Sequence, residues 1–258
     1  MKYSGMLLAV VLTLPAQAAD QNFQKIINCM RASVPLTIRA DNFEIEATDK
    51  AGATRVLKGK LFAKRDKDRM RVMLQISEPS HVAGASYLVL EQANTREDDM
   101  YVFLPSVHRV RHVTGAFANG SLLGTDFSYA EVKQISNAFS GAGGKLEGSD
   151  TIDGLAVDFI TLNPAKAQNS PYSSVKAWVD RKSCLVLRAD FYAGETLRKR
   201  LTVPVESLKQ SGKYWYLSQM DMQDIKEGSH TTLRVGGVQS GKEISSNSFN
   251  PSTFYVGN

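Results

Sequence analysis

Alternation of apolar and polar residues at period two is the feature that most constrains the fold. In residues 69–76, apolar side chains occupy the even positions, and Arg69, Arg71 and Gln75 occupy odd ones. Successive side chains of a strand point to opposite faces of a sheet, so this pattern predicts strands with one apolar and one solvated face. We expect ten to twelve strands, with candidates at residues 43–47, 57–64, 69–76, 86–92, 99–104, 155–162, 175–180, 185–191, 197–203, 214–224 and 231–235.

Two segments are predicted to be helical. Residues 20–32 carry apolar residues at helical spacing, which predicts an amphipathic helix. Residues 128–139 form a second candidate, because Ser128 is followed three residues later by Glu131, the pattern of a capping box. The apolar face of the sheet must be covered, and these segments are the expected covers. The predicted fold class is mainly β (α+β): a large curved sheet or unclosed antiparallel β-barrel with a helical lid, in one domain.

The N-terminus resembles an export signal. Lys2 precedes the apolar run Met6 to Leu14, and Ala16-Gln17-Ala18 follows as a small-residue cleavage pattern. We expect a signal peptide at residues 1–19, cleaved near Ala18 or Ala19, and a mature domain at 20–258. The alternative is an N-terminal core helix. No later run approaches the roughly 20 apolar residues of a membrane-spanning helix, so we expect a soluble periplasmic protein.

The chain has two cysteines, Cys29 and Cys184. In an oxidising compartment the simplest interpretation is one disulfide that ties the N-terminal helix to a distant strand. Two separate buried thiols are the alternative. With two cysteines and no tight His/Cys spacing, we expect no zinc site.

Signatures of catalysis, cofactors and nucleic acid are weak. Ser121 in the stretch 120–124 stands in the wrong place for a nucleophile elbow, and no glycine-rich phosphate cradle occurs. His108 and His112 lie four apart in an expected strand without a third ligand nearby. We therefore expect no enzyme, no metal and no cofactor. The net charge of +5 arises from basic residues that alternate along strands, which favours a solvated outer face or peripheral membrane contact over nucleic acid.

Three ordered blocks carry a family resemblance. Residues 101–111 (YVFLPSVHRVR) with 120–129 (GSLLGTDFSY), then 178–201, then 228–251, resemble the signature of the outer-membrane lipoprotein-sorting (LolA-like) family over nearly all of the mature chain. The resemblance implies an unclosed β-barrel of the LolA/LolB type with a helical lid. It further implies a non-enzymatic periplasmic carrier of lipid, acyl chains or lipidated protein, for transfer towards the outer membrane and outer-membrane biogenesis.

Family members are often found beside an RND-type inner-membrane exporter, so a periplasmic accessory subunit without cargo is the alternative function. In LolA, an arginine at the end of an early strand helps to latch the lid, and Arg65 resembles it, although Asp66 stands where the family has a proline. The block 120–129 is absent from LolA proper, which implies a different cargo. We expect the glycine-rich stretch from Gly115 to Gly124, which includes Gly120, to move when cargo loads.

Alternation also selects candidates for the lining of an apolar cavity. If these residues point to the concave face, they offer an adaptable surface for acyl chains. The alternative is that they merely pack against the helices. The candidates are Met70, Val72, Leu74, Leu187, Phe191, Leu201, Tyr216, Met220 and Met222.

Overall fold

The computed structural model describes residues 15–66, 69–92, 99–113, 119–136, 139, 142–164 and 170–256. Helix α1 is Pro15–Ser33 and helix α2 is Tyr129–Ser136. The strands before α2 are β1 (Thr37–Thr48), β2 (Thr54–Asp66), β3 (Arg69–Glu78), β4 (Ser86–Leu90), β5 (Asp99–Leu104) and β6 (Arg109–Val113). The strands after it are β7 (Gly143–Ile152), β8 (Leu155–Asn163), β9 (Ser174–Asp180), β10 (Val186–Ala193), β11 (Thr196–Thr202), β12 (Leu208–Ser211), β13 (Tyr214–Leu217), β14 (Gln219–Asp224) and β15 (Ser229–Ser240). Short 3-10 turns lie at Pro105–Val107, Val205–Ser207 and Ser246–Phe249.

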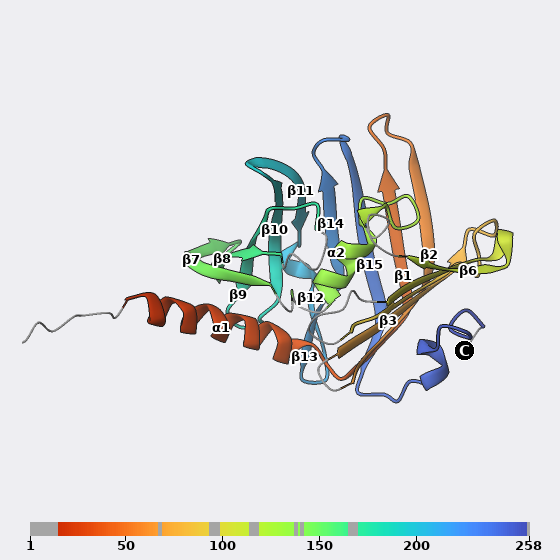
Figure 1. Ribbon diagram of the computed structural model, residues 1–258, viewed down its shortest axis with the longest axis horizontal. Helices are drawn as coiled ribbons and strands as arrows, with labels where there is room; N and C mark the ends of the chain where they lie inside the picture. Colours follow the sequence, from red (N-terminus) through yellow and green to blue (C-terminus); the bar gives the residue numbers. More distant parts are fainter. Residues whose placement is uncertain are drawn as a thin grey trace, which may run out of the picture.

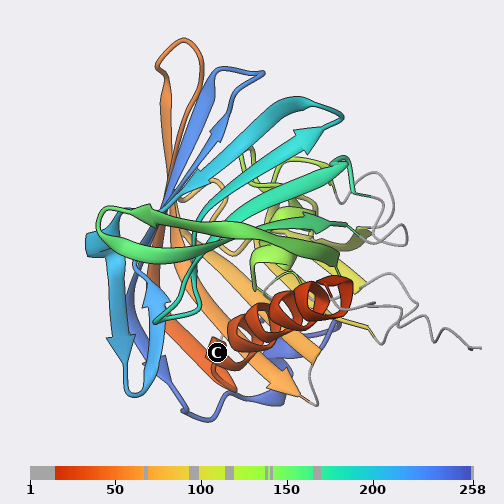
Figure 2. The same cartoon turned by 90° about the vertical axis from the view of Figure 1, so that its left-hand side faces the viewer.

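Thirteen strands form one antiparallel sheet in the order β6-β5-β4-β3-β2-β1-β15-β14-β11-β10-β9-β8-β7 (Figure 1). The long strand β15 pairs with β1, for example Ile45 with Leu233, and so joins the strands that precede α2 to those that follow it. The sheet curves around α2, and α1 lies across its lower part (Figure 2). Its edges β6 and β7 do not pair with each other. The predicted mainly β fold with an unclosed sheet and a helical lid is confirmed.

The helix predicted for residues 20–32 is present, but it begins at Pro15. Its apolar stripe, Phe23, Ile26, Ile27 and Met30, is buried against the concave face of the sheet. The expected cleavage position near Ala18 or Ala19 falls inside this helix, and residues 1–14 lie outside the described part, so the signal peptide stays a prediction. Neither described helix is long and apolar enough to cross a membrane.

The expectation of one solvated sheet face was wrong. Phe62, Met73 and Leu88 of β2, β3 and β4 form a second buried cluster with Ile244, Phe249 and Phe254 of the C-terminal segment, on the side opposite Ala63, Val72 and Val89. The hairpin β12–β13 contributes Leu208 and Leu217 to a further cluster, around Val157 and Val203. Phe62 and Met73 interrupt the polar positions of their strands, and this was the available sequence signal. The sheet needs covers on both faces, not only the two helices.

A buried ionic group stabilises the outer side of β10 and β11. The Asp190 carboxylate is 1% exposed and receives Arg188 Nη2 at 2.7 Å and Arg200 Nε at 2.8 Å. Burial acts to raise the pKa of Asp190, but the hydrogen bonds from Arg200 and Arg188 outweigh it, so the pKa lies below its ordinary value. This carboxylate is therefore charged in the folded protein and pairs two strands.

We predict that Asp190→Asn lowers the free energy of unfolding at pH 7 by about 1.5–3 kcal/mol, because charge-assisted hydrogen bonds are lost. A carboxyl with a lowered folded pKa stabilises above its unfolded pKa of about 3.9, and this contribution is lost as the pH falls through the folded pKa. The variant should therefore show a shallower loss of stability in acid. Urea unfolding between pH 7 and pH 3 measures this.

The control is Asp66→Asn, because Asp66 pairs with Arg71 at 3.0 Å with both side chains more than 40% exposed. It should change stability by less than about 1 kcal/mol. Equal acid sensitivity of Asp190→Asn and the unsubstituted protein would contradict the prediction.

Candidate functional site

The concave face of the sheet carries two adjoining apolar clusters. One joins α1 to strands β8–β11 and β14 through residues such as Ile160, Phe191 and Met222. The other covers β1–β5 and includes Phe43 and Tyr87. Val132 of α2 packs against both clusters. The molecule therefore has a continuous apolar surface under its two helices, as a site for apolar chains requires.

Seven of the nine lining candidates contact this surface. Met70, Val72 and Leu74 belong to the cluster on β1–β5, whereas Phe191, Leu201, Met222 and the half-buried Met220 belong to the other. All are packed against neighbouring side chains, so their role as ligand contacts stays a prediction.

Two candidates lie outside these two clusters. Leu187 packs with Val157 and Val203 in a separate cluster, and a register shift between Val186 and Arg188 interrupts the alternation there. Tyr216 belongs to β13, which pairs only with β12 and not with the large sheet. The alternation of apolar and polar residues predicts neither the bulge at Leu187 nor the separate pairing of β13 with β12.

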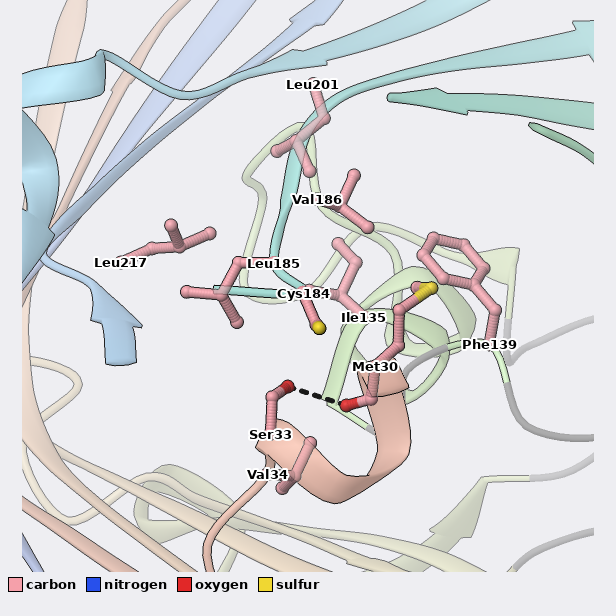
Figure 3. A pocket seen from close by; sticks show the side chains of 10 residues that line it. All are labelled: Met30, Ser33, Val34, Ile135, Phe139, Cys184, Leu185, Val186, Leu201 and Leu217. Atoms are coloured by element: carbon pink, nitrogen blue, oxygen red, sulfur yellow. Dashed lines mark hydrogen bonds between the residues drawn. The ribbon is translucent and has the colours of Figure 1, made fainter. Parts of the chain in front are cut away.

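An apolar cavity of about 70 Å³ lies where the C-terminal ends of α1 and α2 meet the start of β10 (Figure 3). Leu201 is the one sequence candidate in its lining; the wall comprises Met30, Ser33, Val34, Ile135, Phe139, Cys184, Leu185, Val186, Leu201 and Leu217. A methylene group buried here would contribute about 0.8 kcal/mol to the binding of an apolar chain. A long chain does not fit unless a helix moves.

Helix α1 is held at its C-terminal end by two long-range contacts. Cys29 and Cys184 form a disulfide with Cα atoms 5.7 Å apart, which confirms the disulfide and excludes separate thiols. Arg65 Nη2 of β2 donates to the carbonyl oxygen of Arg31 in the last helical turn. A cationic side chain at a helix C-terminus can donate hydrogen bonds to the unpaired carbonyl oxygens, and its charge interacts favourably with the negative end of the helix dipole. This contact is the one expected of a latch, while the functional role of Arg65 stays a prediction.

Helix α2 is held at its N-terminal end. The predicted capping box is confirmed: Ser128 Oγ accepts from Glu131 N at 3.1 Å, and Ser128 N donates to Glu131 Oε2 at 2.7 Å. The Glu131 side chain is 1% exposed and pairs with Lys199 Nζ at 3.1 Å. The Tyr172 hydroxyl also donates to Glu131, and burial followed by the nearby Glu131 charge raises the pKa of Tyr172. Sequence reasoning found Glu131 through its cap but missed Lys199 and Tyr172.

The segment before α2 is anchored to strands β2 and β15. Arg55 of β2 donates to the carbonyl oxygen of Gly124, which has φ +77°, and an added Cβ there would lie 2.7 Å from Arg55 Nη2. The Asp126 carboxylate accepts from Thr231 Oγ1 at 2.6 Å and from Ser229 Oγ, both on β15. Gly124 is therefore required by the backbone and by a close contact.

Gly120 accepts a hydrogen bond from Tyr129 N at 3.3 Å through its carbonyl oxygen. Residues 115–118 of the stretch expected to move lie outside the described part of the chain. The histidine His112 pairs with a carboxylate: its Nε2 atom lies 3.1 Å from Oδ1 of Asp99, a residue of β5. The described residues contain no group of three side chains that could hold a metal ion.

Comparison with known proteins identifies relatives of this fold. A family model described as "Uncharacterized protein" matches residues 68–254. A crystal structure of a DUF1329 family protein from Desulfovibrio piger is 22% identical, with a TM-score of 0.84 over 91% of this chain and 98% of that one. A putative outer membrane lipoprotein-sorting protein domain from Vibrio parahaemolyticus is 20% identical, with a TM-score of 0.82 over 93% of this chain and 100% of that one.

A LolA superfamily protein from Nitrosomonas europaea is 16% identical, with a TM-score of 0.68 over 90% of this chain and 97% of that one. The comparison with curated proteins found no match. At 16–22% identity these solved structures establish the fold of the chain. The cargo and the partners must be argued from the residues of the site.

Proposed function

This chain belongs to the family whose model covers residues 68–254 and has the LolA-like fold, and we propose that it is a periplasmic carrier without catalytic activity. It binds lipid, acyl chains or lipidated protein on its concave face and transfers them towards the outer membrane. The observation that carries the proposal is the continuous apolar surface beneath α1 and α2, together with the cavity at their C-terminal ends. The confirmed disulfide supports export to an oxidising compartment.

Loading requires a helix to move, because the described cavity of about 70 Å³ is too small for a long acyl chain. The disulfide and Arg65 restrain α1, so the C-terminal half of α2 is the segment we propose to open. Gln134 in this half is 7% exposed, and its Oε1 atom has no hydrogen-bond partner among the described residues. An unsatisfied buried amide opposes the closed position by about 1–3 kcal/mol, which lowers the cost of opening.

Release is equally necessary for a carrier. Each methylene of the cargo that takes the place of α2 against the apolar face contributes about 0.8 kcal/mol of binding free energy. When the cargo leaves, α2 closes and regains the free energy of its own contacts. These two free energies nearly balance, so the cargo passes to an acceptor that binds it more strongly. An accessory subunit of an RND-type exporter remains the second class of function, and we have no observation that favours it.

The test is recovery of lipid from natively purified protein by mass spectrometry, together with uptake of a fluorescent fatty acid. The carrier proposal expects co-purified lipid and saturable uptake. Absence of both would overturn it and leave the accessory-subunit alternative.

We predict that Val186→Phe weakens binding of the fluorescent fatty acid about tenfold, equivalent to about 1.4 kcal/mol. Val186 lines the cavity, and a phenyl ring would occupy the space that the chain enters. The matched control is Val107→Phe, because Val107 is 50% exposed in the turn before β6. Equal affinity of both variants in a fluorescence titration would show that the chain binds elsewhere.

A further inference from the structure

A second pocket, of about 380 Å³, lies at the N-terminal end of α2 and is lined mainly by polar side chains. We call it the polar pocket, and the residues that matter to its chemistry are Ser121, Tyr172, Arg198, Lys199, Asp224 and Glu227. The carrier function uses none of its charges directly. The question is what chemical group these side chains would recognise.

A bulge in β11 delivers two adjacent cations to this pocket. Phe191 of β10 lies opposite Lys199, but its neighbour Tyr192 lies opposite Leu197, so Arg198 is the extra residue. Alternation would turn Arg198 and Lys199 to opposite faces. The bulge instead leaves both in the lining of one pocket, and bulges are known to redirect side chains at functional sites.

The two cations differ in how they are paired. Lys199 Nζ is occupied by the carbonyl oxygen of Asp126 at 2.6 Å and by Glu131 at 3.1 Å. Arg198 Nε is buried without a hydrogen-bond partner in the part of the chain that the structure describes. Burial raises the pKa of Tyr172 and the charge of Arg198 opposes this rise, which places the guanidinium near that phenol. Arg198 as a whole is half-buried. A buried Nε–H without a partner is costly, so this guanidinium is suited to an anion that arrives with a ligand.

Two carboxylates contribute to the same pocket from the turn between β14 and β15. Asp224 Oδ1 accepts from the backbone nitrogens of Lys226 at 3.1 Å and Glu227 at 3.0 Å, which orders this turn. Glu227 pairs with Lys226 at 3.7 Å, and both side chains are more than 60% exposed, so this ion pair is weak. The pocket therefore presents one cation that lacks a partner and two carboxylates that can accept a cation.

From this arrangement we propose that the polar pocket binds the zwitterionic headgroup of a phosphoethanolamine-type phospholipid. The phosphate oxygens of the headgroup accept hydrogen bonds from the Arg198 guanidinium. The ammonium group of the headgroup lies between the carboxylates of Asp224 and Glu227. A purely anionic headgroup would satisfy Arg198 but would lie against the negative charges of Asp224 and Glu227. This inference rests on the proposed carrier function, and it specifies the class of lipid.

The position of α2 connects the two pockets. Lys199 and Leu201 are two residues apart on β11, and one lines the polar pocket while the other lines the apolar cavity. Glu131 near the start of α2 pairs with Lys199, and Ile135 near its end lines the cavity. Eight helical residues span about 12 Å. A phospholipid with its headgroup in the polar pocket would thus direct its chains beneath α2.

The test compares the binding of dihexanoyl phosphatidylethanolamine and dihexanoyl phosphatidylglycerol, and of the chain-free probe glycerophosphoethanolamine, by calorimetry. We expect the full chain to prefer the ethanolamine lipid about tenfold. Arg198→Gln should weaken all phosphate-containing probes about tenfold. Because its buried Nε lacks a partner, the same substitution should leave the melting temperature unchanged or raise it, an outcome that a purely structural role would not produce.

Glu227→Gln should reduce the preference for ethanolamine over glycerol while leaving the phosphate contribution intact. The matched control is Glu78→Gln, since Glu78 is in a similarly exposed pair with Lys58 at 3.4 Å. For Arg198 the control is Arg39→Gln, whose side chain is 46% exposed. Neither control should change headgroup affinity.

Equal affinity for both lipids, tighter binding of phosphatidylglycerol, or an unchanged Arg198→Gln variant would overturn the headgroup inference. If fatty-acid uptake persisted in any of these cases, the carrier function would stand without it. Binding of glycerophosphoethanolamine without fatty-acid uptake would instead support the pocket and overturn the carrier function.

Discussion

Removal of the disulfide by Cys29→Ser with Cys184→Ser is expected to lower the free energy of unfolding by about 4–5 kcal/mol. The bond closes a loop with a sequence separation of 155 residues, and the loss of chain entropy in the unfolded state grows with loop length. Urea unfolding of the oxidised protein and the double variant measures the difference. Since small domains are stable by about 5–15 kcal/mol in total, this is the largest single effect we expect.

The control is the unsubstituted protein after reduction, which removes the same bond without changing side-chain volume by more than a hydrogen atom. Both should show faster hydrogen exchange at the C-terminal end of α1, because of its two long-range contacts only the hydrogen bond from Arg65 would remain beside the apolar packing. A loss of less than 1 kcal/mol would show that α1 is fixed by its apolar stripe and not by the bond.

Lys199→Met is expected to lower the free energy of unfolding by about 3–5 kcal/mol, because it leaves the buried carboxylate of Glu131 without its cation. The side chain of Glu131 is 1% exposed and that of Lys199 is 14% exposed, so water cannot replace the lost partner. Loosening of α2 should also speed uptake of the fluorescent fatty acid. Thermal unfolding and stopped-flow uptake measure the two effects.

The informative control is the double variant Glu131→Gln with Lys199→Met. The glutamine oxygen can keep the capping box by accepting from Ser128 N, and its NH2 group can donate to the Tyr172 hydroxyl oxygen, which accepts at the site where Glu131 accepted from it. The glutamine side chain carries no charge. Much of the lost stability should return, as it does when a buried ion pair is replaced as a unit. If the double variant were as unstable as the sum of the two single variants, the pair would not be coupled.

The Cys29–Cys184 disulfide restrains α1, and the Glu131–Lys199 ion pair restrains α2. The disulfide is a covalent restraint that persists while cargo enters and leaves, whereas the Glu131–Lys199 pair is a non-covalent restraint on α2. Arg55 and Asp126 tie the preceding segment to β2 and β15. In the C-terminal half of α2, Gln134 Oε1 has no hydrogen-bond partner among the described residues, which is why we assign the opening motion to this half.

The family signature is explained by these contacts. Gly124 and Asp126 come from the first block, Lys199 from the second, and Ser229 and Thr231 from the third. The structure brings all of them together around the start of α2. The blocks were recognised as ordered strings of residues. Their shared purpose, to hold the lid segment on the sheet, appears only when the strands are assembled.

Prediction from the sequence succeeded where the physics is local. The alternation in residues 69–76 is a steric property of one extended strand, and the apolar stripe of α1 is a property of one helix. The cap formed by Ser128 and Glu131 involves residues three apart. Such features do not depend on what the rest of the chain does.

Prediction from the sequence failed where the pairing with a neighbouring strand decides which way a side chain points. Leu187 and Arg198 each lie at a bulge, and a bulge exists only relative to the partner strand. At the first bulge the predicted lining residue Leu187 packs in a separate cluster, and at the second Arg198 joins Lys199 in the lining of the polar pocket. The covering of Phe62 and Met73 likewise depends on the C-terminal segment, about 180 residues away along the chain.

The sequence by itself thus determined the class of fold, the antiparallel strands, the two helices and the α2 cap, because periodicity and capping are local. It left the cysteines with two interpretations and the lining residues with two roles. Tertiary structure decided the disulfide, the surface that each bulged residue reaches, and the cavity at the ends of α1 and α2. These depend on contacts between distant segments, whose energies no local pattern encodes.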